Sequence, residues 1–394
     1  MNAKMRRNLL LLAACQALGQ SANTMMFAAT ALSVATFLGA REFATLPITV
    51  QHIGVMLSVF PTALLMQRRG RKFGFRLGSM MGMVGACLCG AGLVAGSLAL
   101  MCGGGLVLGY AVANLQMYRF AAVELVPGAL RAKAISWVTA GGILAGMIGP
   151  GVVRLTYDQL APIYLATYAS MFCVHVLVFT VMSFIEFPPP HVPETIEGPQ
   201  RGLLEIARQP RFAVSVAAAM VAFGTMSFLM SASPIAIVGC GLPQTEAHWV
   251  IFLHVMGMFV PSLFTGNLIN RYGVLNMMMA GGAILALAVL PAMSGQGAWN
   301  FRFALMLNGV GWNFLFVGAT TMLTTAYRPS ERGKAQAFND FLMFGTTASS
   351  SFLAAYLLNI YGWFTLNAIA LVMVCGALAA VGWLRWQHRE EAAA

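Results

Sequence analysis

Two short stretches of this sequence place soft metal ligands one helical turn apart. MSFLM sets Met226 and Met230 four residues apart, and HVMGM does the same for His254 and Met258. Residues at i and i+4 share one face of a helix, so each pair can present two ligand atoms together. Thioether sulfur is a good ligand for Cu(I) and a poor one for Mg²⁺ or Ca²⁺, while imidazole suits several transition metals. The chemistry expected here is reversible binding of a soft metal ion.

Chance accounts for the Met pairs better than for the His pairs. With 27 Met in 394 residues, roughly 1.8 Met pairs at this spacing arise at random, and the sequence has two. With six His, chance supplies roughly 0.4 His-x3-Met pairs, yet there are again two. The second is HIGVM, in which His52 precedes His254 by 202 residues. MSFLM alone is therefore consistent with core filling, whereas the His pairs favour a site.

Soft ligands also recur in the first part of the chain. Met25 and Met26 precede Met226 by 201 and 200 residues, which is close to the 202 residues that separate His52 from His254, and HIGVM contributes two more ligands. A solitary cysteine, Cys240, follows the apolar run that carries MSFLM and is a candidate metal relay, although such a cysteine is more often inert. The second half-site predicted from this pattern consists of His52, Met56, Met25 and Met26.

The composition shows which elements must position these residues. Hydrophobic residues make up 59% of the chain and charged residues 9%, with a mean hydropathy of +0.77. Such a chain cannot cover a water-soluble surface, so an integral membrane protein with multiple spans is expected. About 20 apolar residues in a helix cross the ~30 Å hydrocarbon core. We predict twelve such helices, at 8–33, 42–67, 75–97, 98–120, 131–155, 162–186, 211–237, 245–269, 274–294, 300–325, 335–359 and 362–386.

The net charge of +11 follows the expected topology. If both termini are cytoplasmic, 19 of the 23 Lys and Arg residues fall in cytoplasmic segments. This matches the positive-inside rule, so the basicity predicts orientation and no nucleic-acid partner. The basic residues left elsewhere are Arg41, Arg119, Arg154 and Arg302.

Internal repetition predicts two halves. QRRGRKFG, with Gly70, is echoed by NRYG, with Gly273, and PGALRAKA is echoed by PSERGKA at a similar offset of about 202 residues. Between the halves lies a segment rich in Pro and charge, which favours a cytoplasmic linker containing one short helix. The predicted division is an N-terminal six-helix bundle at 1–186, a linker at 187–210 and a C-terminal six-helix bundle at 211–394.

With these features the chain resembles the major facilitator superfamily of secondary transporters over nearly its whole length. The family's loop between helices 2 and 3 reads roughly G-x3-D-R-x-G-R-[RK], and here Ala63 and Gln67 replace its Gly and Asp. The second copy keeps Gly266 but has Asn270 in the acidic position. AGGILAGMIGPGV (140–152) resembles the fifth helix of the antiporter branch. The resemblance implies alternating access, and transporters of this type bind substrate between the repeats, near the bilayer midplane.

Met25, His52, Met226 and His254 are expected at one depth in the membrane. At 1.5 Å per residue they lie roughly 21–25 Å from the cytoplasmic ends of their helices. This level lies slightly to the outer side of the bilayer centre. Ionisable residues are costly at such depth, so His52 and His254 are functional candidates. The alternative for each His is a neutral ring bonded to a neighbouring carbonyl.

MxxxM followed by HxxxM also resembles the bacterial CcoA-like copper importers of this superfamily, which supply copper for cbb3-type cytochrome oxidase. The resemblance implies copper as the transported substrate, a monomer in the bacterial inner membrane, and copper chaperones as partners on either side. A similar branch of the family is associated with riboflavin uptake. The metal-binding residues that the resemblance implies are Met226, Met230, His254 and Met258.

Three further ionisable residues are expected toward the cytoplasmic side, namely Arg119, Glu124 and Asp340. One interpretation is a latch in which Asp340 pairs with Arg68 or Arg71 and closes the inward mouth. The other is proton coupling through Asp340 or Glu124. The latch is favoured because intramembrane charges usually pair.

The hypothesis from sequence is a copper importer that works by alternating access, without enzymatic activity and without a cofactor. No P-loop motif is present, so ATP is not the expected energy source.

One rival hypothesis is an importer or exporter of a small organic molecule, riboflavin-like or drug-like. This rival predicts aromatic and hydrogen-bonding residues around the cavity. A membrane sensor or assembly factor is a second rival. The polar residues that keep the first rival open are Gln16, Gln20, Asn23, Asn114, Gln116 and Asn308.

Overall fold

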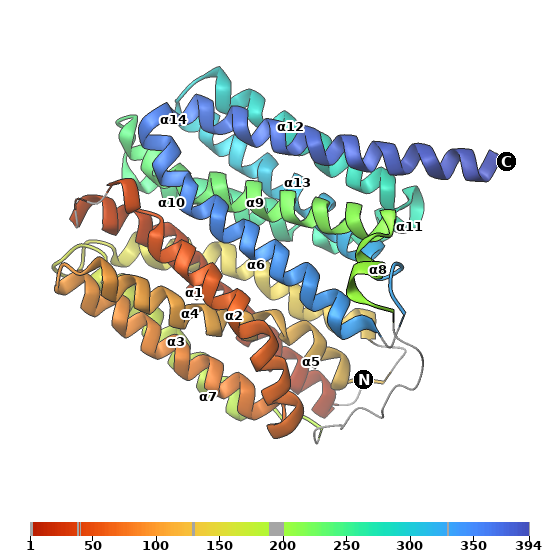
Figure 1. Cartoon of the computed structure of the whole chain (residues 1–394). Helices are drawn as coiled ribbons and strands as arrows, with labels where there is room; N and C mark the ends of the chain where they lie inside the picture. Colours follow the sequence, from red (N-terminus) through yellow and green to blue (C-terminus); the bar gives the residue numbers. More distant parts are fainter. Residues whose placement is uncertain are drawn as a thin grey trace.

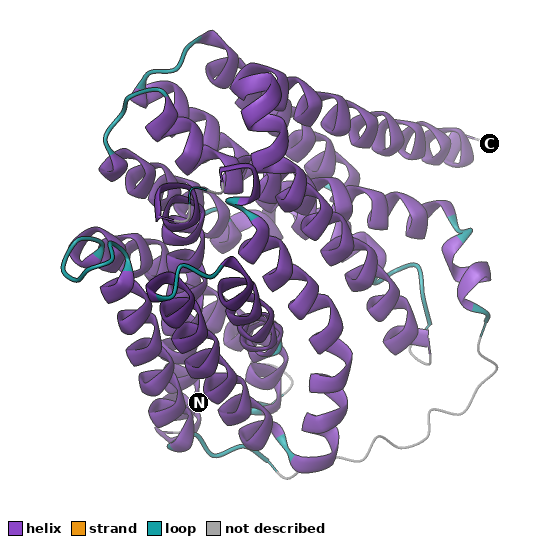
Figure 2. Cartoon of the chain, turned by 60° about the vertical axis from the view of Figure 1, so that its left-hand side comes forward, coloured by secondary structure: helices purple, strands orange, loops and turns teal. Residues whose placement is uncertain are grey.

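The chain is all-helical over the residues that the structure describes. The computed structural model describes residues 3–37, 39, 41–127, 131–188, 201–328 and 331–393. Figure 2 shows helices joined by loops and turns throughout these ranges. Long apolar segments form helices because a bilayer offers no partners for backbone N–H and C=O groups, which a helix satisfies internally. The predicted all-α class is confirmed.

The N-terminal group of helices fills the lower part of Figure 1. Within it α1 packs against α6 and α7, and α4 packs against α2 and α3. Its elements are α1 (Ala3–Phe37), the 3₁₀ helix η1 (Arg41–Phe43), α2 (Leu46–Arg69), α3 (Arg71–Val94), α4 (Leu98–Gln116), α5 (Tyr118–Glu124), α6 (Arg131–Thr156) and α7 (Leu165–Ser183).

The C-terminal group lies above it in the same view. Here α9 packs against α14, and α13 packs against α10 and α12. A short helix, α8, precedes this group where the linker was predicted to contain one. The elements are α8 (Leu203–Ala207), α9 (Pro210–Gly239), α10 (Gln244–Phe259), α11 (Ser262–Tyr272), α12 (Val274–Ser294), α13 (Ala298–Leu323) and α14 (Arg332–Ala393).

Each predicted apolar run falls on helical structure, but two predicted boundaries differ. The run 245–269 is divided into α10 and α11, which meet at a bend of 40°. Pro261 lies at this bend, and proline cannot donate a backbone hydrogen bond there. The runs 335–359 and 362–386 instead share α14, which is broken at Gly362, where φ is 75°.

Within the described ranges, eight segments are long and apolar enough to cross a membrane, or nine with α10–α11 as one bent span. The count of twelve stays a prediction.

The predicted repeat appears as two matching turns. Gly70 joins α2 to α3 with φ 86° and ψ 159°, and Gly273 joins α11 to α12 with φ 85° and ψ 152°. This combination of angles is essentially restricted to glycine. QRRGRKFG and NRYG therefore encode the same chain reversal.

The two groups of helices touch at one end of the molecule and diverge toward the other (Figure 1). We call the touching end the outer end, since the charge pattern predicts that it faces outward. There Thr45 Oγ1 donates to the Ser351 carbonyl at 2.6 Å, and Tyr164 Oη donates to Gln244 Oε1 at 3.3 Å. The rings of Tyr157 and His248 also meet across the groups, at 6.0 Å. The opposite, inner end carries Arg71, Glu124 and α8.

Glycines let the helices of each group cross in close backbone contact. A Cβ on Gly109 of α4 would overlap the Gln51 carbonyl of α2, and one on Gly309 of α13 would overlap the His254 carbonyl of α10. These two crossings are equivalent positions of the two repeats. Small residues favour helix association in membranes because they let the backbones approach.

Substituting either crossing glycine is expected to destabilise the protein. In Gly109→Ala and Gly309→Ala the new methyl group meets backbone, which cannot rotate away, and overpacking costs about 1–3 kcal/mol. We expect the apparent melting temperature in detergent to fall by about 3–10 °C. Gly103→Ala, on the same helix as Gly109 but facing open space, is the matched control and should leave it unchanged. Equal melting temperatures for all three variants would contradict this account.

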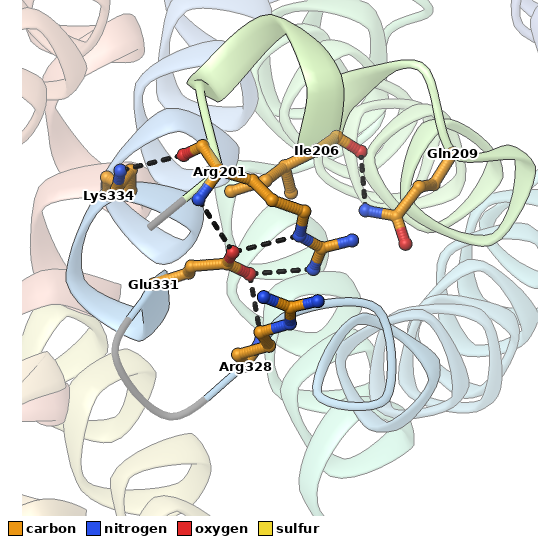
Figure 3. A network of polar contacts seen from close by, with 6 residues as sticks. All are labelled: Arg201, Ile206, Gln209, Arg328, Glu331 and Lys334. Atoms are coloured by element: carbon orange, nitrogen blue, oxygen red, sulfur yellow. Dashed lines mark hydrogen bonds and ion pairs between the residues drawn. The ribbon is translucent and has the colours of Figure 1, made fainter. Parts of the chain in front are cut away.

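A charged network fastens the linker's end to the turn before α14 (Figure 3). Glu331 has no exposed surface, and Arg201 donates to both of its carboxylate oxygens, at 2.8 and 2.7 Å. The backbone N–H of Arg328 donates to Oε2 at 2.9 Å, and Lys334 Nζ donates to the Arg201 carbonyl at 2.9 Å. The hydrogen bonds from Arg201 hold the pKa of the Glu331 carboxyl well below its usual range.

Because the folded-state pKa of Glu331 is depressed, this network stabilises the protein most above the ordinary carboxyl pKa. The contribution is complete above about pH 4.3 and is lost as the pH falls toward the lower folded-state value. We expect Glu331→Gln to lower the melting temperature at pH 7, and the difference from wild type to shrink in acid. Glu42→Gln, at an exposed position, is the control. A difference that grows on acidification would contradict the assignment.

Candidate functional site

The main candidate site is a cavity of about 210 Å³ between the two groups of helices. Helices from both groups line it, and its walls include residues that the sequence places far apart. The lining side chains are Gln16, Gln20, Asn23, Thr24, Phe27, Gln51, His52, Val55, Val112, Leu115, Gln116, Arg119 and Val138 from the N-terminal group, and Phe223, Met226, Met230, Val255, Met258, Phe259, Ser262, Trp312, Asn313, Phe316, Val317 and Phe344 from the C-terminal group.

Side-chain amides dominate the polar part of the N-terminal wall. Gln51 Nε2 donates to Asn23 Oδ1 at 3.2 Å, while Gln51 Oε1 is buried and has no hydrogen-bond partner among the described residues. The amides of Gln16, Gln20 and Gln116 line the cavity beside them. Each amide offers two donors and one acceptor oxygen. This wall can therefore bind several hydrogen-bonding groups of one ligand.

Aromatic rings dominate the C-terminal wall. The Phe223 ring lies at its centre, 5.2 Å from Trp312, 4.8 Å from Phe316 and 6.0 Å from Phe344 between centroids. Trp312 and Phe316 are stacked at 5.0 Å with an interplanar angle of 24°. Trp312 Nε1 is buried and has no partner in the part of the chain that the structure describes, so this ring also offers a hydrogen-bond donor. The wall presents a rigid apolar face suited to a planar ligand.

Asn313 is the exception on this wall, because its amide is already used inside the protein. Its Nδ2 donates to the Met258 carbonyl at 2.8 Å and also to Ser262 Oγ, and Thr265 Oγ1 donates to its Oδ1 at 2.6 Å. These bonds tie α13 to the α10–α11 bend. We infer that Asn313 positions the bend and does not bind a ligand.

The structure brings together three of the four predicted metal ligands. Met226, Met230 and Met258 line the cavity. His254 lies outside the lining found among the described residues, is fully buried, and contacts the Leu305 carbonyl through Nδ1 at 2.8 Å. This is the alternative of a ring bonded to a neighbouring carbonyl, and it ties α10 to α13. The His254 Nε2 atom has no hydrogen-bond partner within the described ranges.

The predicted second half-site is dispersed. His52 lines the cavity beside Phe27, whose ring centroid lies 5.9 Å away. Met25 and Met26 are fully buried in the core, where Met26 Sδ accepts a hydrogen bond from Thr30. Met56 is half-buried and faces Gly345 of α14. Cys240, the predicted relay, follows the last residue of α9.

The residues proposed for the latch have other partners in this structure, whose inner end diverges, so the latch stays a prediction. Arg71 is bound instead to Glu124 of its own group, with Nη2 to Oε1 at 2.6 Å and Nε to each oxygen at 3.2 Å. Arg68 is exposed. Asp340 accepts from Asn339 at 3.0 Å and interacts electrostatically with Arg119, whose side chain reaches the cavity. Glu124 is nearer to Arg71 in the fold because α5 follows α4 back to the inner end.

The aromatic wall is the part of the site that the sequence hypothesis did not identify residue by residue. The chain has 26 Phe and seven Trp, so aromatic residues by themselves carry little positional information. Four of the six polar residues proposed for an organic ligand do line the cavity, namely Gln16, Gln20, Asn23 and Gln116. Asn114 lines a smaller neighbouring space, and Asn308 is buried elsewhere.

Comparison with protein families gives a direct match. The Major Facilitator Superfamily model matches residues 9–243 and 214–394, which together cover nearly all of the chain. The chain belongs to the major facilitator superfamily. It is thus an integral, multi-pass membrane protein, and its family consists of transporters. The first match extends through α9 of the C-terminal group, and the second begins within α9.

Relatives within this superfamily include one protein with a named substrate. The chain is 38% identical over 376 residues to the riboflavin transporter RfnT of Brucella anthropi, with 94% of each chain covered. It is 26% identical over 371 residues to the uncharacterized MFS-type transporter YdeG of Bacillus subtilis, covering 90% of this chain and 86% of the relative.

Solved structures show the same fold at low sequence identity. A point mutant of the nucleoside transporter NupG superposes with a TM-score of 0.73 at 12% identity, covering 96% of this chain and 98% of the other. A D-xylose-proton symporter gives 0.72 at 15% identity, with 95% and 96% covered. These likenesses establish the major facilitator fold.

Proposed function

We propose that this superfamily member carries a riboflavin-like organic molecule across the bacterial inner membrane by alternating access. The observation that supports this most directly is the two-sided cavity, with amides on one wall and stacked aromatic rings on the other. Riboflavin combines a planar fused ring, polar ring-edge atoms and a polyhydroxyl chain. The relative with a named substrate, at 38% identity, transports riboflavin.

Each wall suits a different part of such a molecule. The planar ring system is matched by the face formed by Trp312, Phe316 and Phe223, since aromatic rings prefer stacked or edge-to-face contacts. The hydroxyls and the polar ring edge are matched by the amides around Gln51 and Asn23. Polar groups that fix orientation within an otherwise apolar cavity are typical of small-molecule sites.

The cavity supports an organic substrate better than a bare copper ion. A space of about 210 Å³ holds on the order of ten waters, which exceeds what one ion among direct ligands requires. His254, which the copper hypothesis needs as a ligand, is not among the described residues that line the cavity. The three methionines then form an adaptable apolar surface that accommodates a ligand ring.

Alternating access requires the contacts at the outer end to separate. They include the pairs Tyr164 with Gln244 and Tyr157 with His248, and α2 also packs against α14 and α6 against α10 across the two groups. Rigid-body rotation about an interface is one of the known ways in which proteins switch between states. The closed outer end and diverging inner end correspond to a state that opens toward the inside.

Uptake measurements test the proposed function. Cells that lack riboflavin synthesis and riboflavin import should grow on low riboflavin, and accumulate tritiated riboflavin, only when they express this chain. Parallel cells receive radioactive copper. Riboflavin uptake at the level of the empty vector would refute the proposal, and copper uptake in those same cells would restore the metal hypothesis.

Replacing the three cavity methionines separates the two substrates further. In Met226→Leu/Met230→Leu/Met258→Leu the sulfur atoms are lost, but side chains of similar volume remain, and such swaps usually cost less than about 1.5 kcal/mol. We expect riboflavin uptake to stay within about threefold of wild type. Met277→Leu/Met278→Leu on α12, away from the cavity, is the control. Loss of all riboflavin uptake in the triple variant alone would show that the thioethers are required.

A further inference from the structure

An open groove lies at the inner end of the N-terminal group, where α1, α3 and α7 meet. Its volume is about 560 Å³, and among the described residues it shares no lining side chain with the substrate cavity. α3 packs against α4 and α7, and α7 packs against α1, α3 and α6, so this side of the molecule faces away from the C-terminal group (Figure 1). The groove therefore belongs to the surface that meets lipid. The residues that line it are Arg7, Leu11, Lys72, Ser183, Phe184 and Glu186.

Positive charge dominates this groove. Glu186 is the carboxylate among the described residues that line it, and Lys4 and Arg7 already pair with its two oxygens, at 2.5 and 2.8 Å. Lys72 has neither a hydrogen bond nor an ion pair within the described ranges. Three cations thus face one carboxylate, and the groove keeps a net positive charge that attracts anions.

The basic surface continues one helical turn deeper into the membrane, along the seam between α3 and α7. Lys72 and Arg76 are four residues apart on α3, and Phe179 and Ser183 are four residues apart on α7, so each pair shares one face of its helix. The Arg76 guanidinium lies over the Phe179 ring, 4.4 Å from its centroid. Arg76 is therefore the next cation after Lys72 along the same seam.

Apolar side chains border these cations. Phe184 follows the last residue of α7 and is 65% exposed, and Leu11 of α1 lines the groove one turn from Arg7. A phospholipid combines an anionic phosphate with apolar acyl chains, so it matches both kinds of surface. Basic pockets between transmembrane helices on the cytoplasmic side are typical binding sites for anionic lipid headgroups.

The second repeat forms the same turn without these cations. The two turn glycines are 203 residues apart, and this offset pairs Lys72 with Leu275 and Arg76 with Met279. α12 thus begins after its turn with apolar residues at both equivalent positions. The turn and the helix that follows it do not require the two charges for folding, which favours a role for Lys72 and Arg76 in binding.

We propose that this groove binds the headgroup of an anionic phospholipid of the cytoplasmic leaflet, such as phosphatidylglycerol. Lys72 and Arg76 bind the phosphate from α3, and Arg7 approaches it from α1. The acyl chains pack against Phe184 and Leu11. The lipid thereby joins α1 to α3 and stabilises the N-terminal group at the end where the two groups of helices diverge.

The purified full chain in a neutral detergent tests this site. The melting temperature is measured with added phosphatidylglycerol, with phosphatidylcholine at the same concentration, and with inorganic phosphate. A ligand that binds only the folded protein raises its stability. We expect phosphatidylglycerol to raise the wild-type melting temperature by about 3 °C or more, and the other two additives by less than about 1 °C.

Charge variants locate the binding. Lys72→Gln/Arg76→Gln should weaken phosphatidylglycerol binding, measured by native mass spectrometry, about 30-fold, because each basic residue near an anionic surface contributes a factor of about five. Lys72→Arg/Arg76→Lys keeps both charges and should bind within about threefold of wild type. Arg68→Gln/Arg271→Gln removes the same charge from exposed positions of the inner end outside the groove and is the control.

Each other outcome overturns the proposal. Equal loss of binding in Lys72→Gln/Arg76→Gln and in the control would mean diffuse attraction without a site. Equal stabilisation by phosphatidylcholine would exclude recognition of net charge, and equal stabilisation by inorganic phosphate would assign the groove to the free ion. If the neutral variant does not fold, wild-type binding that is unchanged between about 0.05 and 0.5 M NaCl would refute the role of the cations. Riboflavin is absent from every arm, so these results are independent of the transported substrate.

Discussion

Trp312→Ala is expected to lower the initial rate of riboflavin uptake about 10- to 100-fold. The substitution removes the ring that stacks on Phe316 and meets Phe223 at the centre of the aromatic wall. Stacking of a base-like ring on an aromatic side chain contributes about 1–3 kcal/mol, and each 1.4 kcal/mol is about tenfold in affinity. Trp312→Phe keeps a ring at this position and should retain uptake within about threefold.

The matched control for this prediction lies on the same helix. Trp299 is 64% exposed near the start of α13, so Trp299→Ala removes the same side chain without touching the cavity. Membrane abundance is measured for each variant so that uptake is compared per molecule. Normal uptake by Trp312→Ala at normal abundance would refute the aromatic wall as a binding surface.

Asp340→Asn is expected to reduce uptake about tenfold at every pH. Arg119 reaches the cavity, and its Nε is buried without a hydrogen-bond partner among the residues that the structure describes, so the Asp340 charge compensates the guanidinium charge. Opposite charges attract one another more strongly inside a protein than in water, because the effective dielectric constant is lower there. Neutralising Asp340 leaves the guanidinium uncompensated. The double variant Arg119→Gln/Asp340→Asn should recover part of the loss.

The pH profile distinguishes this structural role from proton coupling through Asp340. Uptake measured from about pH 5 to 8 should keep its wild-type shape in Asp340→Asn, at a lower level. Glu42→Gln, at the exposed 3₁₀ helix η1, is the control for loss of a carboxylate. A flattened profile in Asp340→Asn alone would instead support proton coupling through Asp340.

Much of the architecture follows from the sequence, because the length and composition of an apolar segment are enough to predict that it forms a membrane-spanning helix. The all-α membrane fold and the equivalence of Gly70 and Gly273 needed no tertiary information, because a glycine at a chain reversal is required locally. Spacing likewise placed Met226 and Met230 on one face of α9, and the structure turns that face to the cavity.

The partner of each polar side chain was decided by tertiary structure. Helical spacing fixes the direction of a residue on its own helix, but it does not fix how neighbouring helices rotate against one another. His254 thus meets the Leu305 carbonyl and is not among the described residues that line the cavity with the three methionines, and Arg71 meets Glu124 in place of Asp340. The aromatic wall likewise forms only when α9, α13 and α14 pack together, since its rings are more than 100 residues apart between Phe223 and Phe344.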